Sequence, residues 1–212
     1  MKLALFDLDG TLIDSEEGIL GTIEHALARL GVASPPRTEL RGWIGPPLRA
    51  TFPRVLGDDA ERVEQAIAHY SERFSETGWR EHRVYDGIGE VIDGLASRGV
   101  ALAVVTTKVE RHADPIVRNL PFGARFERVY AAAAGSRSSE KAAMIARALA
   151  EFGIAANDAV MVGDRHFDID GARANAVRAI GVGWGFGSLD ELRDAGADAI
   201  AATPTELHAL LS

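Results

Sequence analysis

The chain has 212 residues, of which 47% are hydrophobic and 25% charged, with a net charge of −8 and no cysteine. This length allows a sizeable core in one or two domains. The lack of cysteine excludes disulfides, thiolate catalysis and zinc–thiolate sites. An acidic chain without a basic run argues against a nucleic-acid polymer as partner. No apolar stretch approaches the ~20 residues of a membrane span, so we expect a cytoplasmic protein that does not enter a membrane.

The chain begins with a short apolar run that ends in two acidic residues. Residues 3–6 predict a buried strand, and Asp7 and Asp9 follow it. Because a strand has a period of two, both carboxylates should point the same way. Together they repel each other and create a negative potential that a divalent cation would neutralise. Gly10 then permits a sharp turn and a close approach to a ligand, which predicts a metal-assisted nucleophile site at the sheet edge.

Residues 14–81 show helical periodicity and contain no convincing strand. Apolar residues recur at helical spacing from Ile19 to Leu30, and further helical patterns cover 48–56 and 58–74. A turn, Gly45-Pro46-Pro47-Leu48, lies between them. We therefore expect an all-helical insertion at 14–81 that forms a small second domain.

The remainder of the chain alternates helices with apolar strands. Strands are predicted at 101–105, 128–132, 159–162 and 179–182, and helices at 88–98, up to about 120, at 140–152 and at 168–175. Such alternation is typical of a doubly wound parallel sheet that is covered on both faces. The sequence thus predicts an α/β core domain made of residues 1–13 and 82–212.

Polar residues follow two more of these strands and precede one helix. Thr106, Thr107 and Lys108 end the strand at 101–105, and Asp164 and Asp168 follow Gly163 after another strand. Lys141 opens a helix after the polar loop 135–139. Because the carboxyl ends of parallel strands share one edge, a hydroxyl, a lysine and up to four acids should converge there.

These motifs together resemble the haloacid dehalogenase-like hydrolase superfamily, and the resemblance covers the whole chain. Asp7-Leu8-Asp9-Gly10-Thr11 is similar to its first motif, Thr106 to its second, Lys141 to its third, and Gly163-Asp164 with Asp168 to its fourth. The Gly45-Pro46-Pro47-Leu48 turn and the loop 183–188 resemble the phosphoglycolate-phosphatase-like branch, which carries a helical cap after the first motif. Thr107 departs from the pattern, since many relatives have Asn there.

The resemblance implies a role for each motif residue. Asp7 would attack phosphorus to form an aspartyl-phosphate, and Asp9 would act as general acid and then general base. Thr106 and Lys141 would hold phosphoryl oxygens. Mg²⁺ would bind Asp7, Asp9 (through its carbonyl), Asp164 and Asp168. Substrate contacts would come from Gly10, Thr106, Thr107 and Lys141, and Arg49 would meet an anionic leaving group.

Each residue taken alone also has an ordinary structural interpretation. Asp168 could cap the helix that follows it, and Thr106 could simply end a strand. Lys141 by itself would be a surface lysine, and Arg49 could lie on the outer face of its helix. Only their combination in this order favours catalysis.

The resulting prediction is a Mg²⁺-dependent phosphatase that acts on a small phosphomonoester, as a monomer or homodimer. Phosphoglycolate is the first expected substrate and a nucleoside 5′-monophosphate the second. A phosphomutase would keep both acids of the first motif, and a catalytically silent binding protein could share the fold. A dehalogenase would need only the first carboxylate, so Asp9 argues against that reaction.

Overall fold

The centre of the molecule is a six-stranded parallel sheet with the order β5-β4-β1-β6-β7-β8. The computed structural model describes residues 1–133 and 140–212, so the polar loop 135–139 lies outside the described residues. The strands are β1 (Leu3–Phe6), β4 (Ala101–Val109), β5 (Arg128–Ala132), β6 (Ala159–Gly163), β7 (Arg178–Val182) and β8 (Ala199–Ala201). The predicted α/β fold with a parallel sheet is confirmed.

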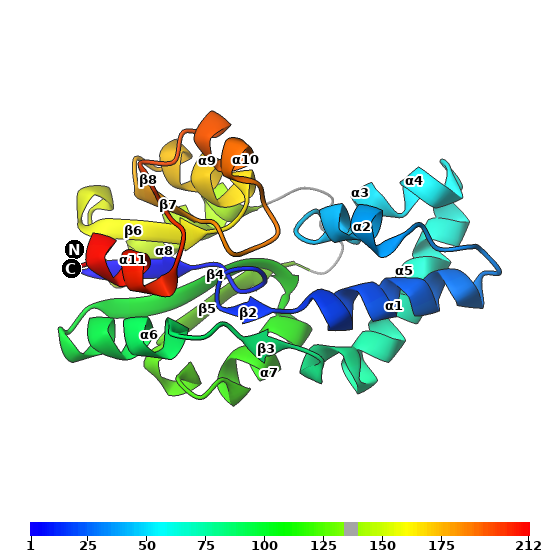
Figure 1. Ribbon diagram of the computed structural model, residues 1–212, viewed down its shortest axis with the longest axis horizontal. Coiled ribbons are helices and arrows are strands. Elements are labelled where there is room, and N and C mark those ends of the chain that lie inside the picture. The colour runs from blue at the N-terminus through cyan, green and yellow to red at the C-terminus, as the bar shows by residue number, and fades with distance from the viewer. Residues whose placement is uncertain (134–139) are drawn as a thin grey trace.

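Helices cover both faces of this sheet (Figure 1). Helices α8 (Lys141–Phe152), α9 (His166–Ala174) and α10 (Leu189–Asp194) lie on one face, and α6 (Ile88–Ser97), α7 (Glu110–Asn119) and α11 (Pro204–Leu210) on the other. The central strand β1 serves both cores, because Leu3 and Leu5 pack on one side while Ala4 and Phe6 pack on the other. Burial on both faces is why the strand is apolar at every position.

The chain between β1 and β4 contains a helical segment, residues 14–81, which extends to one side of the sheet (Figure 1). Its helices are α1 (Glu16–Arg29), α2 (Arg37–Leu40), α3 (Leu48–Thr51), α4 (Pro53–Leu56) and α5 (Ala60–Glu76), with 3₁₀ turns at Arg41–Trp43 and Gly78–Arg80. Helices α1 and α5 pack along each other. The single helix predicted over 48–56 is wrong, because Pro53 cannot donate a backbone hydrogen bond and the chain breaks into two short helices there.

Two strands of two residues each stand where the chain passes between the sheet and the helical segment. Strand β2 (Ile13–Asp14) pairs with β3 (Arg83–Val84) in antiparallel register. The Arg83 guanidinium lies 2.7 Å from the Asp14 carboxylate. The sequence analysis did not predict this ribbon, since two residues are too few to show a periodicity.

Strand β8 and helix α9 also differ from the prediction, and helices α10 and α11 were not predicted. Strand β8 was not expected, and it is only three residues long. Helix α9 begins at His166, two residues before the predicted start, because the Asp168 carboxylate accepts the backbone N–H of Arg165 at 3.0 Å and closes the first turn. Asp168 therefore caps its helix from inside the first turn.

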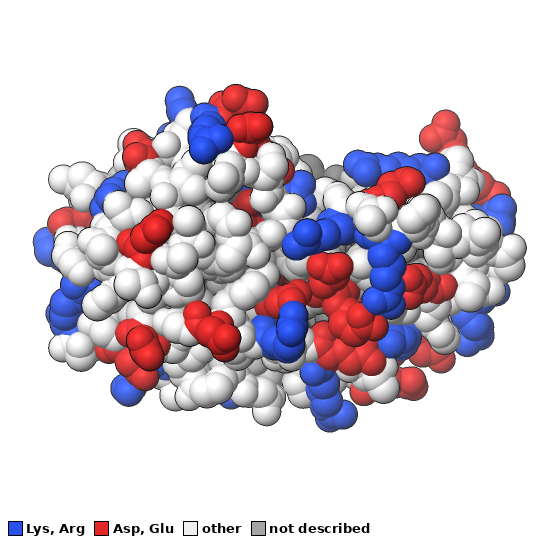
Figure 2. Space-filling view, viewed as in Figure 1, with Lys and Arg blue, Asp and Glu red and all other residues white. Residues whose placement is uncertain are grey.

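Charged side chains of both signs are intermixed over the helical segment in Figure 2. Arg37 pairs with Glu17 and Glu24, and Arg41 pairs with Glu16. Within the described ranges, no helix combines the length and the apolar character needed to cross a bilayer.

Candidate active site

Three buried carboxylates meet at the carboxyl edge of the sheet. Asp7 follows β1, Asp164 follows β6, and Asp168 lies in the first turn of α9. Phe6 lies opposite Val162 in the parallel register, and Asp7 and Asp164 follow this pair by one and two residues. One oxygen from each carboxylate lies within 4.8 Å of the others, and the three residues are 7%, 0% and 0% exposed. The structure thus brings together three of the four predicted metal ligands.

Lys141 joins two of these acids from the first residue of α8. Its ammonium nitrogen lies 2.7 Å from Asp7 Oδ1 and 2.5 Å from Asp168 Oδ1. It also donates to the Val105 carbonyl at 2.7 Å. The side chain is 2% exposed, so this lysine is part of the buried cluster and not a surface residue.

The cluster holds more negative than positive charge away from water. Burial raises the pKa of Asp7 to about 7, although the Lys141 ammonium opposes that shift. Burial, together with the charges of Asp7 and Asp168, raises the pKa of Asp164 well above its ordinary value. Burial also disfavours the Lys141 cation, but Asp168 and Asp7 outweigh this and hold its pKa above the usual value. One ammonium among three carboxylates leaves a charge that a bound cation would offset.

Glycines make room for these acids. Gly10 has a φ of +83°, and a Cβ atom there would lie 2.1 Å from Asp164 Oδ2. A Cβ atom at Gly163 would lie 2.1 Å from the Asp168 carboxyl carbon. The Asp164 carboxylate is oriented by the Phe186 N–H, which donates to Oδ2 at 2.7 Å. An all-oxygen, carboxylate-rich cradle of this kind fits a hard divalent cation such as Mg²⁺.

The Asp9 side chain belongs to a different part of the site. Its Oδ2 atom lies 3.2 Å from the ammonium of Lys108, and the Asp9 side chain is 13% exposed. Its Oδ1 atom is buried and has no hydrogen-bond partner among the described residues. Asp7 and Asp9 both line the same pocket, so the second carboxylate faces the space in front of the first.

The two threonines that end the apolar part of β4 face different surroundings. Thr106 is 1% exposed, and its hydroxyl accepts the backbone N–H of Lys108 at 3.1 Å. The Thr107 hydroxyl donates to the Gly45 carbonyl at 3.0 Å. Thr107 thus contacts the predicted turn of the helical segment, while Thr106 stays within the core.

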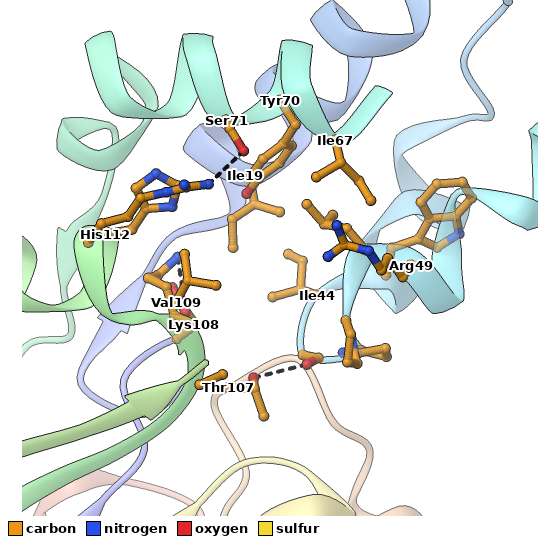
Figure 3. Close-up of a pocket in the computed structure, with 18 of the residues that line it drawn as sticks. Ile19, Ile44, Arg49, Ile67, Tyr70, Ser71, Thr107, Lys108, Val109 and His112 are labelled. Atoms are coloured by element: carbon orange, nitrogen blue, oxygen red, sulfur yellow. Dashed lines mark hydrogen bonds and ion pairs between the residues drawn. The ribbon is translucent and has the colours of Figure 1, made fainter. Parts of the chain in front are cut away.

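A pocket of about 260 Å³ separates the acids from the helical segment. In Figure 3, Ile67 and Tyr70 project into it from α5, with Ile19 beside them, opposite Ile44 and Val109. Apolar side chains from both parts of the molecule therefore surround the space next to Asp7 and Asp9.

Two arginines also line this pocket. Arg49 makes a bidentate contact with Glu64, at 2.8 and 2.7 Å, so its charge is already paired. Arg111 donates to the Ser71 hydroxyl at 2.9 Å and forms no ion pair with the carboxylates of residues 1–133 and 140–212. The predicted leaving-group contact Arg49 lies at the pocket wall, and Arg111 was not predicted.

Sequence reasoning assigned no role to Lys108, Tyr70 or His112, which all line the pocket. The only available signal was the position of Lys108 directly after the two threonines. Tyr70 and His112 lie within helical patterns that look like those of ordinary core residues. Arg165 forms an ion pair with Glu191 at 2.8 Å.

Residues 4–182 match the haloacid dehalogenase-like hydrolase family. The chain belongs to this family. A 5′-nucleotidase of Pseudomonas aeruginosa is 44% identical over 89% of this chain and 86% of its own length. Tyrosine-protein kinase PtkA of Mycobacterium tuberculosis is 37% identical over 99% of this chain and 72% of its own.

Structural similarity agrees with the family membership. A predicted phosphatase from Clostridium acetobutylicum superposes with a TM-score of 0.92 at 34% identity, over 99% of this chain and 97% of that one. A more distant relative, a phosphoglycolate phosphatase of Pseudomonas fluorescens, is 29% identical over 87% of this chain and 70% of its own length. Family members with this fold thus carry names for hydrolysis and for phosphoryl transfer.

Proposed function

We propose that this protein is a Mg²⁺-dependent phosphatase that hydrolyses a small phosphomonoester through an aspartyl-phosphate on Asp7. The observation that carries the proposal is the position of Asp7, which contacts Lys141, lies within the acid cluster and lines the pocket. A carboxylate in that position can receive a phosphoryl group delivered from the pocket side.

Each residue of the site has a role in two successive steps, the transfer of the phosphoryl group to Asp7 and the hydrolysis of the aspartyl-phosphate. Asp7 attacks phosphorus, and Asp9 gives a proton to the departing oxygen and later takes one from the attacking water. Lys141 and Thr106 stabilise the phosphoryl oxygens as charge develops. Mg²⁺, held by Asp7, the Asp9 carbonyl, Asp164 and Asp168, would neutralise the phosphoryl charge and orient it for in-line attack.

The helical segment would act as a cap domain that selects the leaving group. Most of the pocket wall opposite the acids is apolar, formed by Ile44, Ile67 and Tyr70 among others. Such a wall would pack against a nucleoside, whereas glycolate offers a single methylene group. Together with the 44% identity to a 5′-nucleotidase, this supports a nucleoside 5′-monophosphate as substrate.

Phosphoglycolate is the second candidate, and one observation favours it. The Arg111 guanidinium at the pocket carries a charge that no described carboxylate neutralises, and it could meet the carboxylate of glycolate. The phosphoglycolate phosphatase relative agrees with this possibility.

A rate panel with Mg²⁺ separates these substrates. We would measure kcat/KM for several nucleoside 5′-monophosphates, phosphoglycolate and sugar phosphates, each with the wild type and with Tyr70→Ala. If a nucleoside packs on this wall, the variant loses activity on nucleotides while p-nitrophenyl phosphate is hydrolysed nearly as before. Full activity after exhaustive metal removal, or no activity on any ester, would refute the proposal.

A further inference from the structure

We infer that Lys108 is a positioning residue for Asp9, which holds one carboxylate oxygen and leaves the other free to meet the leaving group. The inference rests on the proposed function, in which Asp9 is the general acid and base. It assigns a task to a buried lysine that the four sequence motifs do not include.

An irregularity in strand β4 turns Lys108 toward the site. The pairing with β5 runs regularly up to Thr106 opposite Ala131, and the next pair is Val109 opposite Ala132. Two residues of β4 are therefore inserted without partners on β5. Such bulges are found beside active sites, where they redirect a side chain. Here the Lys108 N–H bonds to the Thr106 hydroxyl, and the lysine side chain reaches Asp9.

The ammonium of Lys108 is largely shielded from solvent and lies between Asp9 and an aromatic ring. Its side chain is 7% exposed, and its nitrogen lies 3.2 Å from Asp9 Oδ2. The same nitrogen stands 4.5 Å from the centroid of the Phe74 ring, on helix α5. Phe74 is 1% exposed and stacks on Tyr70 at 5.4 Å. A desolvated cation held over a fixed ring gives Asp9 a rigid partner.

Because of this contact, the two oxygens of the Asp9 carboxylate have different surroundings. Oδ2 is held by Lys108, whereas Oδ1 is buried and has no hydrogen-bond partner among the described residues. An unpartnered buried oxygen beside a pocket is unfavourable unless a ligand supplies the missing contact. A leaving-group oxygen or the attacking water would supply it. Without Lys108 the carboxylate could rotate, and proton transfer would lose its geometry.

The test compares two classes of ester in Lys108→Met. Release of a poor leaving group, such as an alkoxide, needs the proton from Asp9 and should slow by about 10- to 100-fold. Release of p-nitrophenolate in the first turnover should stay close to the wild-type rate, because this group departs without a proton. Hydrolysis of the aspartyl-phosphate also needs Asp9, so rapid quench with labelled ester should show phosphoenzyme accumulating.

Two further variants serve as controls. Lys108→Arg can still pair with the carboxylate and stack on Phe74, and it should restore much of the alkyl-ester rate. Lys2→Met removes another lysine–aspartate pair, the exposed contact with Asp158, and should leave both rates unchanged. The unfolding temperature of each variant identifies any loss that is due to misfolding.

Several results would overturn the inference. An equal rise in KM for both ester classes, without phosphoenzyme, would mean that Lys108 binds the substrate itself. Unchanged rates in Lys108→Met would remove it from the mechanism. A crystal structure of this variant gives a readout that does not depend on activity, since the Asp9 carboxylate should rotate and an unmoved one contradicts the inference. Inactivity of the wild type would instead refute the proposed function.

Discussion

The acid cluster and the pocket wall differ in how their side chains are held. Lys141 contacts Asp7, Asp168 and the Val105 carbonyl, and all of these belong to elements of the sheet domain. The wall beside Ile67 and Tyr70 is apolar and comes mostly from the helical segment. Polar contacts fix atoms in one geometry, while apolar contacts only exclude water and set a shape. Chemistry and selectivity can therefore change separately in this fold.

The two regions meet through a few polar contacts. Thr107 donates to the Gly45 carbonyl, and the Arg165 guanidinium donates to the carbonyl of the preceding residue, Ile44. Lys108 contacts the Phe74 ring, and Arg111 and His112 of α7 bond to Ser71 and Ser75 of α5. Because these contacts involve a limited set of residues, substitutions can be directed at the acid cluster, at the pocket wall or at the contacts between them.

The largest loss of activity is expected for substitution of Asp7, the proposed nucleophile. Asp7→Asn keeps the shape of the side chain but removes its nucleophilic charge, so turnover should fall by about 10⁴-fold or more. Steady-state rates with p-nitrophenyl phosphate measure this, and circular dichroism checks the fold. Asp170→Asn, at an exposed acid of the same edge, is the matched control and should retain activity. Substantial activity in a folded Asp7→Asn protein would contradict the covalent route.

Substitution of Asp164, a proposed metal ligand, should change activity and stability in opposite directions. Three buried carboxylates repel each other, so Asp164→Asn should raise the unfolding temperature of the metal-free protein while abolishing metal-dependent activity. In the wild type, added Mg²⁺ should raise the unfolding temperature, and chelation should stop turnover. Thermal scans with and without Mg²⁺ measure both effects. An equal Mg²⁺ shift in wild type and variant would show that Asp164 is not a ligand.

Arg49 tests the pocket wall without disturbing the acids. Arg49→Met would leave the Glu64 carboxylate near the pocket without its bidentate partner, and this charge should repel anionic leaving groups. We expect KM for phosphoglycolate to rise by about 3- to 10-fold, in line with a lost charge-assisted contact. Arg54→Met, at an exposed position of the same segment, is the control. An unchanged ranking of substrates would remove Arg49 from the specificity argument.

His112, which contacts Ser75 of the helical segment, should make the stability of the protein depend on pH. Burial, with the nearby charges of Lys108 and Arg111, lowers the pKa of this histidine to about 4. The unfolded chain therefore binds more protons as the pH falls from about 6.5 toward 4, and stability is lost across that window. His112→Gln, which can still bond to Ser75, should reduce the loss between pH 7 and 5 by about 1 kcal/mol. Urea unfolding at both pH values measures it, and parallel losses would contradict the assignment.

The smallest effect is expected at the Thr107 contact. Thr107→Val removes the hydrogen bond to the Gly45 carbonyl but keeps the branched shape, so KM for the preferred substrate should rise about 2- to 5-fold. The first turnover of p-nitrophenyl phosphate should be unchanged. Thr77→Val, which removes a hydroxyl that donates to the Arg73 carbonyl at the end of its own helix, is the matched control. A kcat loss without a KM change would place Thr107 in the chemistry instead.

The sequence alone predicted five of the six strands of the sheet and the order of the site residues. A short, fully apolar run such as residues 3–6 favours a strand buried on both faces, and an acid directly after such a strand is expected at the sheet edge. Because all parallel strands end at that edge, Asp7, Asp164 and Thr106 could be placed together without coordinates. Gly10 added to this, because a glycine directly after the acidic pair predicts a sharp turn, and its φ is +83° in the structure.

Only the tertiary structure decided what faces the substrate. Lys108 reaches Asp9 because β4 contains a bulge, and the sequence of β4 has no pattern that predicts this bulge. Tyr70 and Phe74 follow the helical periodicity of α5, which does not tell a pocket wall from a core. Arg49 was predicted at the leaving group, but its pairing with Glu64 depends on how α3 lies against α5. Local periodicity fixes which face of an element is apolar, whereas the packing of elements decides what that face meets.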